Sequence, residues 1–512
     1  MCLRLDCDFA KEFAKGRFFF GVANAPYLCE GGYNVPGGPY NNYGYYERDG
    51  RVPRSGETNG FWTRFREHVS LAASLGMDVF RMGLDWSRVQ PAATLAIGPA
   101  PRWDERALDH YAEIVGAVRD YGLEPIITLH HFTHPAWLGE QMWLSDEAVD
   151  LLIAYELRVV EEVNNRLVAS GRSVIRHFIT FNELNLIPQI YYLGVLRDKR
   201  DKENVMRVSP AYDNVLRAHI AVYDGLYDLF ERKSWGPLQV GFGTASAVEY
   251  DYDRLFLDFV RLRSFGVSQD EVDSAIRELR DVWASRMERL TRTKLTDEQY
   301  EAYVGQAAEA QRVVQVERFT KALSALYSSP REHKLDYISV NVYEPLGRAK
   351  SKGVAAAFPK WWEFGADPEV YYAFIHAYND ANRGLPVYMG ENSLAYRQPI
   401  GGIAEERPDG WDRDRFLRSR LMTVVRCMIE GVPVRGFIYW SLVDDFEWEA
   451  GFEPRLGLYN YDYVNQTIRA VDARGYAAGE TYAMLAAALR SGDKERISRV
   501  FTKVRFGGGR EP

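Results

Sequence analysis

Two glutamates stand at the ends of apolar runs in this chain of 512 residues. The run Val387–Gly390 ends at Glu391, and the run Ile175–Asn182 ends at Glu183. A carboxylate at the end of a buried strand is costly unless a site uses it. Two strands that deliver carboxylates to one rim of a sheet could perform acid/base or nucleophilic chemistry on one bond. Either glutamate alone is as readily explained as the first exposed residue after a strand.

Other predicted strands also end in polar or aromatic side chains. The residues at these strand ends are Arg81, His131, Asn182, Glu183, Asn341, Tyr343, Glu391 and Trp440. A single residue such as His131 is more often a satisfied core histidine than a functional group. Because so many strands end in such groups together, the pattern indicates an active site.

Eight strand-length segments alternate with helix-period segments along the chain. The predicted strands are Phe18–Ala23, Val79–Leu84, Pro125–His131, Ile175–Glu183, Leu238–Phe242, Asp336–Tyr343, Val387–Glu391 and Val434–Ser441. This alternation, without a repeated mononucleotide-binding half, predicts an α/β fold of the (β/α)8 TIM-barrel type. In such barrels the chemistry takes place at the carboxyl ends of the strands.

Helices are predicted between these strands from apolar periodicity and capping residues. They cover Phe61–Leu75, Asp104–Tyr121, Ser145–Ser170, Ala211–Phe230, Asp367–Gly384, Asp412–Glu430 and Glu480–Leu489. The charged, helix-patterned segment at about 252–328 is interpreted as a helical elaboration after the fifth strand, with a solvated charged face. We therefore expect one domain over residues 1–512, with a core at about 17–490 and a loose tail at 503–512.

Composition and charge disfavour several classes of protein. A formal net charge of −8 argues against a nucleic-acid-binding protein. No apolar run approaches the roughly 18 residues needed to span a bilayer, so no membrane association is expected. The N-terminus lacks the apolar segment of a secretory signal, which makes a cytoplasmic location the expectation. The aromatic content of 14% suits either a bulky core or a site that stacks sugar rings.

Neither a cofactor nor a metal is predicted. The loop Gly31–Gly44 contains no phosphate-binding glycine motif, and none of the four cysteines has zinc-site spacing. His130, His131 and His134 share one loop, but no nearby carboxylate completes a metal shell, so a metal-dependent enzyme is a weak alternative.

Two carboxyl groups with aromatic neighbours fit glycoside hydrolysis. One acid protonates the leaving oxygen, while the other attacks the anomeric carbon or activates water. These roles need one group kept protonated and the other kept ionised. Arg81 beside a carboxylate would hold it ionised, and Tyr343 could donate a hydrogen bond to the same group.

From about Phe18 to Asp462 the chain resembles glycoside hydrolase family 1, the β-glucosidase and β-galactosidase family. Thr180–Leu184 resembles its TFNEP signature, and Met389–Ser393 resembles its (I/V)TENG motif. The family stretches RFSxxWSR, TLxHWDLP, NYY, WSLLDNFEW and FGLY are matched in order by Arg81–Arg88, Thr128–Pro135, Asn341–Tyr343, Trp440–Trp448 and Leu456–Tyr459.

The resemblance implies a retaining β-glycosidase that cleaves a small-molecule glycoside through a covalent glycosyl-enzyme. Glu183 would be the acid/base and Glu391 the nucleophile, with carboxyl groups about 5–5.5 Å apart. The resemblance also implies supporting residues, Arg81, Asn182, Asn341 and Tyr343, and sugar-binding residues, His131, Phe132, Trp440, Glu447 and Trp448. Glu183 excludes the thioglucosidase variant, which has Gln at that position.

Four positions depart from the family pattern. Leu28 aligns with a sugar-binding Gln, Phe132 replaces a Trp, Leu184 replaces a Pro, and Gly390 replaces a Thr. Because Leu offers no hydrogen bond, the subsite is expected to suit a sugar lacking or modified at the hydroxyls that Gln would bind, or a sugar bound in another register. A 6-phosphosugar is disfavoured, since Glu447 would repel the phosphate.

Two other functions stay open at this point. A transglycosylase would use the same two carboxylates, with an acceptor alcohol outcompeting water, and product analysis with added alcohol would separate the two. A non-catalytic sugar-binding protein is the weaker alternative, because both carboxylates are present. The sequence does not identify the sugar or the aglycone, and a homo-oligomer is compatible with it.

Overall fold

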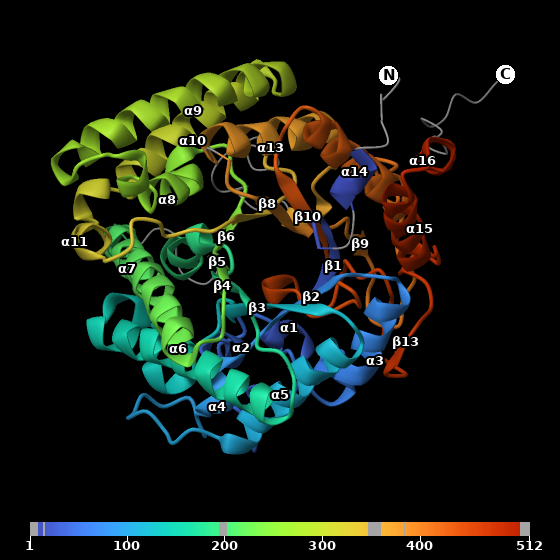
Figure 1. The fold of residues 1–512 in the computed structure, drawn as a ribbon, viewed down its shortest axis with the longest axis horizontal. Coiled ribbons are helices and arrows are strands. Elements are labelled where there is room, and N and C mark those ends of the chain that lie inside the picture. The colour runs from blue at the N-terminus through green and yellow to red at the C-terminus, as the bar shows by residue number, and fades with distance from the viewer. Residues whose placement is uncertain (1–8, 14–15, 194–201, 347–359, 383, 502–512) are drawn as a thin grey trace.

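The computed structural model describes residues 9–13, 16–193, 202–346, 360–382 and 384–501. Parallel strands occupy its centre and helices surround them (Figure 1). The strands of the main sheet are β1 (Phe19–Ala23), β2 (Val79–Gly83), β3 (Glu124–His130), β4 (His177–Phe181), β5 (Gln239–Gly241), β6 (Gly243–Ala245), β7 (Ile338–Asn341), β8 (Val387–Asn392) and β10 (Val434–Trp440). Their order is β5-β4-β3-β2-β1-β10-β8-β7-β6.

The sheet closes into a barrel where its two ends meet. β5 pairs with β4 and β6 pairs with β7, and only Phe242 separates β5 from β6. The two short strands therefore fill one strand position, and the predicted (β/α)8 barrel is confirmed. The fifth strand was predicted to end at Phe242, which is wrong because it resumes at Gly243. The strand Gly243–Ala245 contains a glycine and no apolar run, so its sequence did not signal a strand.

The helices that flank the barrel strands lie close to their predicted positions. They are α3 (Phe61–Ser74), α5 (Glu105–Asp120), α6 (Asp146–Ala169), α7 (Lys202–Lys233), α13 (Pro368–Asn382), α14 (Arg413–Ile429) and α15 (Ala478–Ser491). The side chains of Asp104, Ser145 and Asp412 each accept a hydrogen bond from a backbone N–H in the first turn. These caps satisfy donors that a helix start leaves unpaired, which is why the starts could be predicted.

Two boundaries were predicted wrongly. α7 begins at Lys202 and holds Pro210 inside it, whereas the prediction began it at Ala211. A further helix, α16 (Lys494–Phe501), buries Ile497, Val500 and Phe501, so packed structure continues beyond the predicted core limit of about residue 490. The predicted loose tail at 503–512 lies outside the described residues.

The segment between β6 and β7 is helical, as predicted. It contains α8 (Arg254–Phe259), α9 (Val272–Lys294), α10 (Asp297–Val313) and α11 (Thr320–Ser328). Its charged residues do not all form a solvated face, however. Arg254 and Asp258 form an ion pair at 2.7 Å, with side chains only 1% and 2% exposed. On α8 the charges are therefore internal, because each guanidinium or carboxylate has a buried partner one helical turn away.

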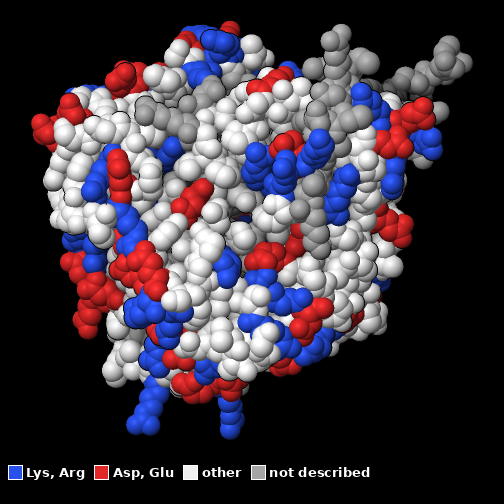
Figure 2. All heavy atoms as spheres, in the orientation of Figure 1, with Lys and Arg blue, Asp and Glu red and all other residues white. Residues whose placement is uncertain are grey.

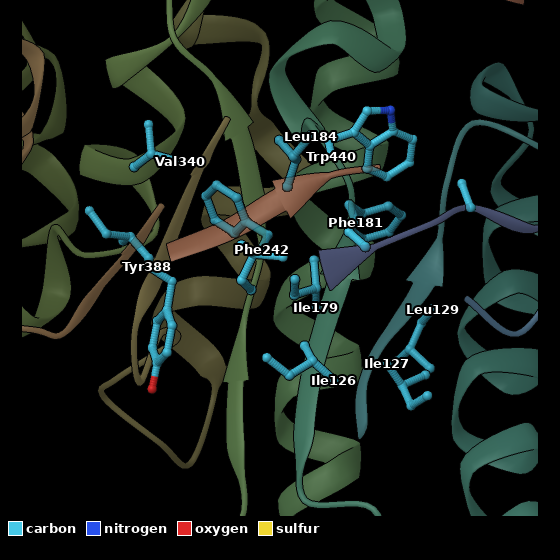
Figure 3. Close-up of a cluster of buried hydrophobic side chains, with 14 of the residues drawn as sticks. Ile126, Ile127, Leu129, Ile179, Phe181, Leu184, Phe242, Val340, Tyr388 and Trp440 are labelled. Carbon is cyan, nitrogen blue, oxygen red and sulfur yellow. The ribbon is translucent and has the colours of Figure 1, made fainter. Parts of the chain in front are cut away.

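Apolar side chains fill the barrel below the strand ends. Figure 3 shows Ile126, Ile179, Phe242 and Val340 among the buried residues of this cluster. Parallel strands covered on both faces favour such nearly continuous apolar runs. The polar groups of the site therefore stand at one end of a packed interior.

The outer surface carries charges of both signs. On the face shown in Figure 2, acidic and basic side chains are intermixed, and no continuous basic surface covers its coloured part. Within the described residues, no helix is both long and apolar enough to cross a membrane.

The helix α15 is tied to the barrel by one hydroxyl group. Tyr482 accepts a hydrogen bond from the Gly21 N–H at 3.1 Å and donates one to the Phe437 carbonyl at 2.7 Å. Tyr482→Phe removes these hydrogen bonds from buried backbone groups of β1 and β10, so we expect the free energy of unfolding to fall by about 0.5–1.5 kcal/mol. Urea denaturation measures this, with Tyr476→Phe at an exposed position as the control. Equal unfolding midpoints for both variants would contradict the prediction.

Candidate active site

The two predicted carboxylates meet on either side of one amide. Glu391 belongs to β8, and Glu183 follows β4 directly, with φ 44° and ψ 56°. Asn341, the last residue of β7, donates from Nδ2 to Glu183 Oε1 at 3.0 Å and to Asn182 Oδ1 at 3.1 Å, and it lies close enough to Glu391 to lower the pKa of that carboxyl group. Both glutamates are buried, at 8% and 3% exposure. The fold thus brings together three strand ends that lie far apart in the sequence.

A fully buried arginine holds the Glu391 side of the site. Arg81 on β2 donates from Nη1 to Glu391 Oε1 at 2.8 Å and to the Gly390 carbonyl at 3.2 Å. Its Nη2 donates to Asn182 Oδ1 at 2.6 Å, and its Nε donates to Thr128 Oγ1 at 3.1 Å. The planar fork of the guanidinium therefore fixes the positions of groups on three other strands or strand ends.

The second oxygen of Glu391 is held by a phenol. Tyr343 donates its hydroxyl to Glu391 Oε2 at 2.8 Å. Because Arg81 holds Oε1, each oxygen of this carboxylate has a strong donor. Glu183, in contrast, accepts from one neutral amide.

These unequal surroundings separate the proton affinities of the two acids. Burial raises the pKa of Glu183 to about 8, and the nearby charge of Glu391 adds to the effect. Burial also raises the pKa of Glu391, but Arg81 and Tyr343 oppose this rise. Hydrogen bonds and opposite charge favour the ionised form, so Glu391 loses its proton before Glu183 does. The pair consists of one acid and one carboxylate near neutral pH.

Asn182 and His131 form the next pair of contacts. Asn182 Nδ2 lies 3.1 Å from His131 Nε2. Burial lowers the pKa of His131 well below its usual value, so its ring is neutral and Nε2 accepts this hydrogen bond. His130 lies elsewhere, with its ring packed against Trp143 and Phe181.

The aromatic residues predicted to bind sugar surround the same rim. Trp440, at the end of β10, donates its indole N–H to Glu447 Oε1 at 3.1 Å, and its ring centroid lies 5.6 Å from that of His131. Figure 3 shows the Trp440 indole at the edge of the apolar cluster. The structure places all of these groups together, while their contacts with a sugar stay a prediction.

Trp448 lies in a group of aromatic rings that the sequence did not fully predict. Its ring centroid is 5.3 Å from Phe132 and 6.0 Å from His131, as expected for one subsite. It also lies 4.9 Å from Tyr43 and 5.7 Å from Tyr27, neither of which was predicted as a site residue. The tyrosine-rich segment around residues 40–46 was the available signal.

Three predicted site residues have left-handed backbone conformations. Glu183, Phe132 and Trp448 have φ values of 44°, 65° and 49°. Such conformations cost side-chain-bearing residues roughly 1 kcal/mol or more and persist where the surrounding structure holds them. They turn the chain sharply after β4, after β3 and after the loop that follows β10.

The structure explains one of the departures from the resembled motifs. A Cβ atom built on Gly390 would lie 1.9 Å from Ser339 Oγ on the neighbouring strand β7. The threonine expected from the motif would therefore require the Ser339 side chain to move. Leu28, on the short helix α1 (Pro26–Cys29), is fully buried, and its carbonyl accepts from the Phe446 N–H at 3.0 Å. Leu28 is thus beside the loop that carries Glu447.

Two further contacts were missed. Thr128 positions Arg81 through Nε, and nothing in the strand pattern singled it out. Asp445 lies within hydrogen-bonding reach of Glu447, and the signal was an acid at a position where the resembled motif has Asn.

The histidine loop does not gather into a metal site. His134 Nε2 is bonded to the Gly139 carbonyl at 2.9 Å, away from His131. Across the residues that the structure covers, no group of three or more His, Cys, Asp or Glu side chains could hold a metal ion.

Sequence comparisons agree over most of the chain. The sequence model described as Glycosyl hydrolase family 1 matches residues 10–476. Beta-glucosidase A of Thermotoga maritima is 24% identical over 491 residues, covering 91% of this chain and 96% of that protein. The bifunctional beta-D-glucosidase/beta-D-fucosidase of Bifidobacterium breve is 25% identical, covering 89% and 95%. The 6-phospho-beta-galactosidase of Clostridium acetobutylicum is 21% identical, covering 88% and 93%.

A comparison with solved structures supports the fold. The family 1 beta-glucosidase from Thermotoga maritima superposes with a TM-score of 0.63 at 19% identity, over 92% of this chain and 97% of that one. The structure of the beta-glucosidase in complex with deoxynojirimycin gives a TM-score of 0.65 with the same coverage.

The raised pKa of Glu183 has a consequence for stability. A carboxyl group that ionises near pH 8 when folded, but near pH 4.5 when unfolded, binds more protons in the folded state between these values. Stability from this group therefore falls as pH rises from about 4.5 to about 8. The glutamine in Glu183→Gln does not titrate. The urea concentration at the unfolding midpoint of this variant should therefore rise relative to that of wild type as the pH increases from 5 to 8.

The matched control is Glu113→Gln. Glu113 is exposed, and a hydrogen bond from Arg66 lowers its pKa, so its replacement removes no such penalty. A difference between Glu183→Gln and wild type that stays constant over this pH range would contradict the prediction.

Proposed function

The chain belongs to glycosyl hydrolase family 1 and is a glycoside hydrolase, and we propose that it is a retaining β-glycosidase acting by double displacement. Its substrate is a small glycoside with a terminal β-linked sugar. Glu391 is the nucleophile and Glu183 the acid/base. The observation that carries these assignments is the difference in surroundings: both oxygens of Glu391 accept strong hydrogen bonds, whereas Glu183 is buried with one amide donor.

In the first step, Glu391 attacks the anomeric carbon and Glu183 protonates the departing glycosidic oxygen. The C1–O bond to the aglycone breaks, and a bond forms from C1 to a Glu391 oxygen. Burial keeps Glu183 protonated at neutral pH, so a proton is ready for the leaving group. The hydrogen bonds from Arg81 and Tyr343 keep Glu391 ionised and aimed.

In the second step, water replaces the enzyme at C1. Glu183, now a carboxylate, takes a proton from the water as its oxygen attacks, and the Glu391 ester breaks. Asn341 donates to Glu183 and so holds this carboxyl group in place for both steps. Asn182, oriented by Arg81 and His131, is proposed to bond the sugar 2-hydroxyl.

The sugar subsite is proposed to differ from that of an ordinary β-glucosidase. Leu28 and Phe132 place apolar groups where the family pattern has an amide and an indole N–H. Although one relative is named a 6-phospho-beta-galactosidase, Glu447 would repel a phosphate here. The sugar is therefore one that lacks or replaces hydroxyls at C3 or C4.

A 2-deoxy-2-fluoro β-glycoside with a good leaving group should inactivate the enzyme by accumulating the glycosyl-enzyme. Peptide mass analysis should find the label on Glu391. Glu183→Ala should reduce turnover of substrates with poor leaving groups by about 10²–10⁴-fold, because general acid catalysis is lost. A label on any other residue would overturn the assignment of the nucleophile.

Azide rescue separates the two roles. In Glu391→Gly, azide should attack from the vacated side and yield the α-glycosyl azide from a dinitrophenyl β-glycoside. In Glu183→Ala, azide should intercept the glycosyl-enzyme and yield the β-glycosyl azide. The opposite stereochemistry in either variant would mean that the roles are reversed.

Leu28→Gln tests the proposed subsite. With a panel of aryl β-glycosides differing at C3 and C4, wild type should favour a sugar modified at one of these carbons. The variant should shift preference toward plain glucoside and galactoside, since the new amide can bond their hydroxyls. Highest kcat/KM on the plain sugars, unchanged by the substitution, would remove this idea.

A further inference from the structure

We propose that Asp445 determines the sugar specificity of this enzyme, and that the sugar carries an ammonium group bound by Asp445 and Glu447 together. The inference rests on the proposed function, because it describes the sugar held in the same site. The proposed function leaves open which group replaces a hydroxyl of the sugar, and the inference identifies this group as an ammonium group.

The first support is a pair of buried carboxyl groups in contact. Asp445 and Glu447 are each 1% exposed, and their side chains are within hydrogen-bonding reach of each other. Asp445 Oδ1 accepts a long hydrogen bond of 3.3 Å from Ser441, and Oδ2 has no donor among the described residues. Two carboxylates this close cannot both ionise without a cation, so without substrate they share a proton.

The second support is the identity of the residue at position 445. The motif WSLLDNFEW, which Trp440–Trp448 resembles, has asparagine at this position. An amide there would give Glu447 a neutral donor. Asp445 instead gives the subsite a second acid, and the pair then needs a positive partner.

The third support is the absence of that partner in the protein. Among the described residues, no Lys, Arg or His side chain is hydrogen-bonded to Asp445 or Glu447. Arg81, the cation of the site, has Nε, Nη1 and Nη2 bonded to Thr128, Glu391, Gly390 and Asn182. The neighbouring charges that act most strongly on Glu447 belong to Glu391 and Glu449, and both are acidic.

The fourth support is the group of aromatic rings next to the pair. Trp440 is bonded to Glu447, and Trp448 lies among Tyr43, Phe132 and His131. Faces of aromatic rings attract ammonium groups in a site without water. The side chain of Leu28, whose carbonyl is bonded to the Phe446 N–H, offers no hydrogen bond to a hydroxyl. The subsite therefore favours a cation over the hydroxyls of a neutral sugar.

Binding of such a sugar would exchange one positive charge for another. The ammonium group would sit against both carboxyl groups, and the proton that they share would leave to solvent. Only a sugar with a cationic substituent gives this exchange, so proton release on binding is a signature of the pair.

The test uses S-linked aryl β-glycosides, which bind without being cleaved. Isothermal titration calorimetry at pH 6.5 compares a thioglucoside with its 3-amino-3-deoxy, 4-amino-4-deoxy and 6-amino-6-deoxy analogues. We expect at least one amino analogue to bind wild type about tenfold or more tightly than the neutral compound. Repeating the titration in buffers of different ionisation enthalpy should show proton release for that analogue alone.

Asp445→Asn restores the amide and should abolish both the preference and the proton release, whereas Asp120→Asn, at an exposed ion pair with Arg172, should change neither. If no amino analogue binds wild type more tightly, or if Asp445→Asn keeps the full preference, the inference is wrong. Circular dichroism checks that Asp445→Asn is folded. If the variant does not fold, the comparison of amino and neutral analogues on the wild-type enzyme still tests the inference.

These outcomes are independent of those for the proposed function. Labelling of Glu391 by a fluoro-sugar, with no preference for amino analogues, would leave the glycosidase standing and remove the ammonium site. Preferred binding of an amino analogue without labelling of Glu391 would do the reverse.

Discussion

The buried ion pair between Arg81 and Glu391 is the interaction on which the rest of the site depends. β2 and β8 are not neighbours in the sheet, since β1 and β10 lie between them. The guanidinium crosses this gap and also bonds Asn182 and Thr128. Breaking a buried pair leaves an unpaired charge that costs about 3–5 kcal/mol. The pair therefore ties β2 to β8 across the two strands that separate them.

Around this pair, the protein distributes few positive charges among many acids. Arg81 is ion-paired with Glu391, whereas Glu183 accepts a hydrogen bond from the amide of Asn341 and retains its proton. Asp445 and Glu447 lie outside the reach of that guanidinium and are left with each other. The same scarcity of cations thus gives Glu183 and Glu391 their different surroundings and leaves Asp445 and Glu447 without a positively charged hydrogen-bond partner among the described residues.

Sequence patterns predicted the strands and the paired acids, because buried parallel strands and their polar ends leave strong local signals. The strand Gly243–Ala245 escaped, since two glycines flanking Phe242 show no apolar run. α7 began earlier than predicted because tertiary packing tolerates Pro210 inside it. Thr128 and Tyr27 could not be found either. Their part depends on which side chains the closed barrel brings within contact, and spacing along the chain does not encode that.

Gly390 lies so close to Ser339 that the residue allowed at position 390 depends on the residue at position 339. A Cβ on residue 390 would fall 1.9 Å from the serine hydroxyl, so threonine fits there only if the Ser339 side chain turns away. A side chain at position 390 therefore depends on how the side chain at position 339 is placed, and the pairing of β7 with β8 couples the two positions.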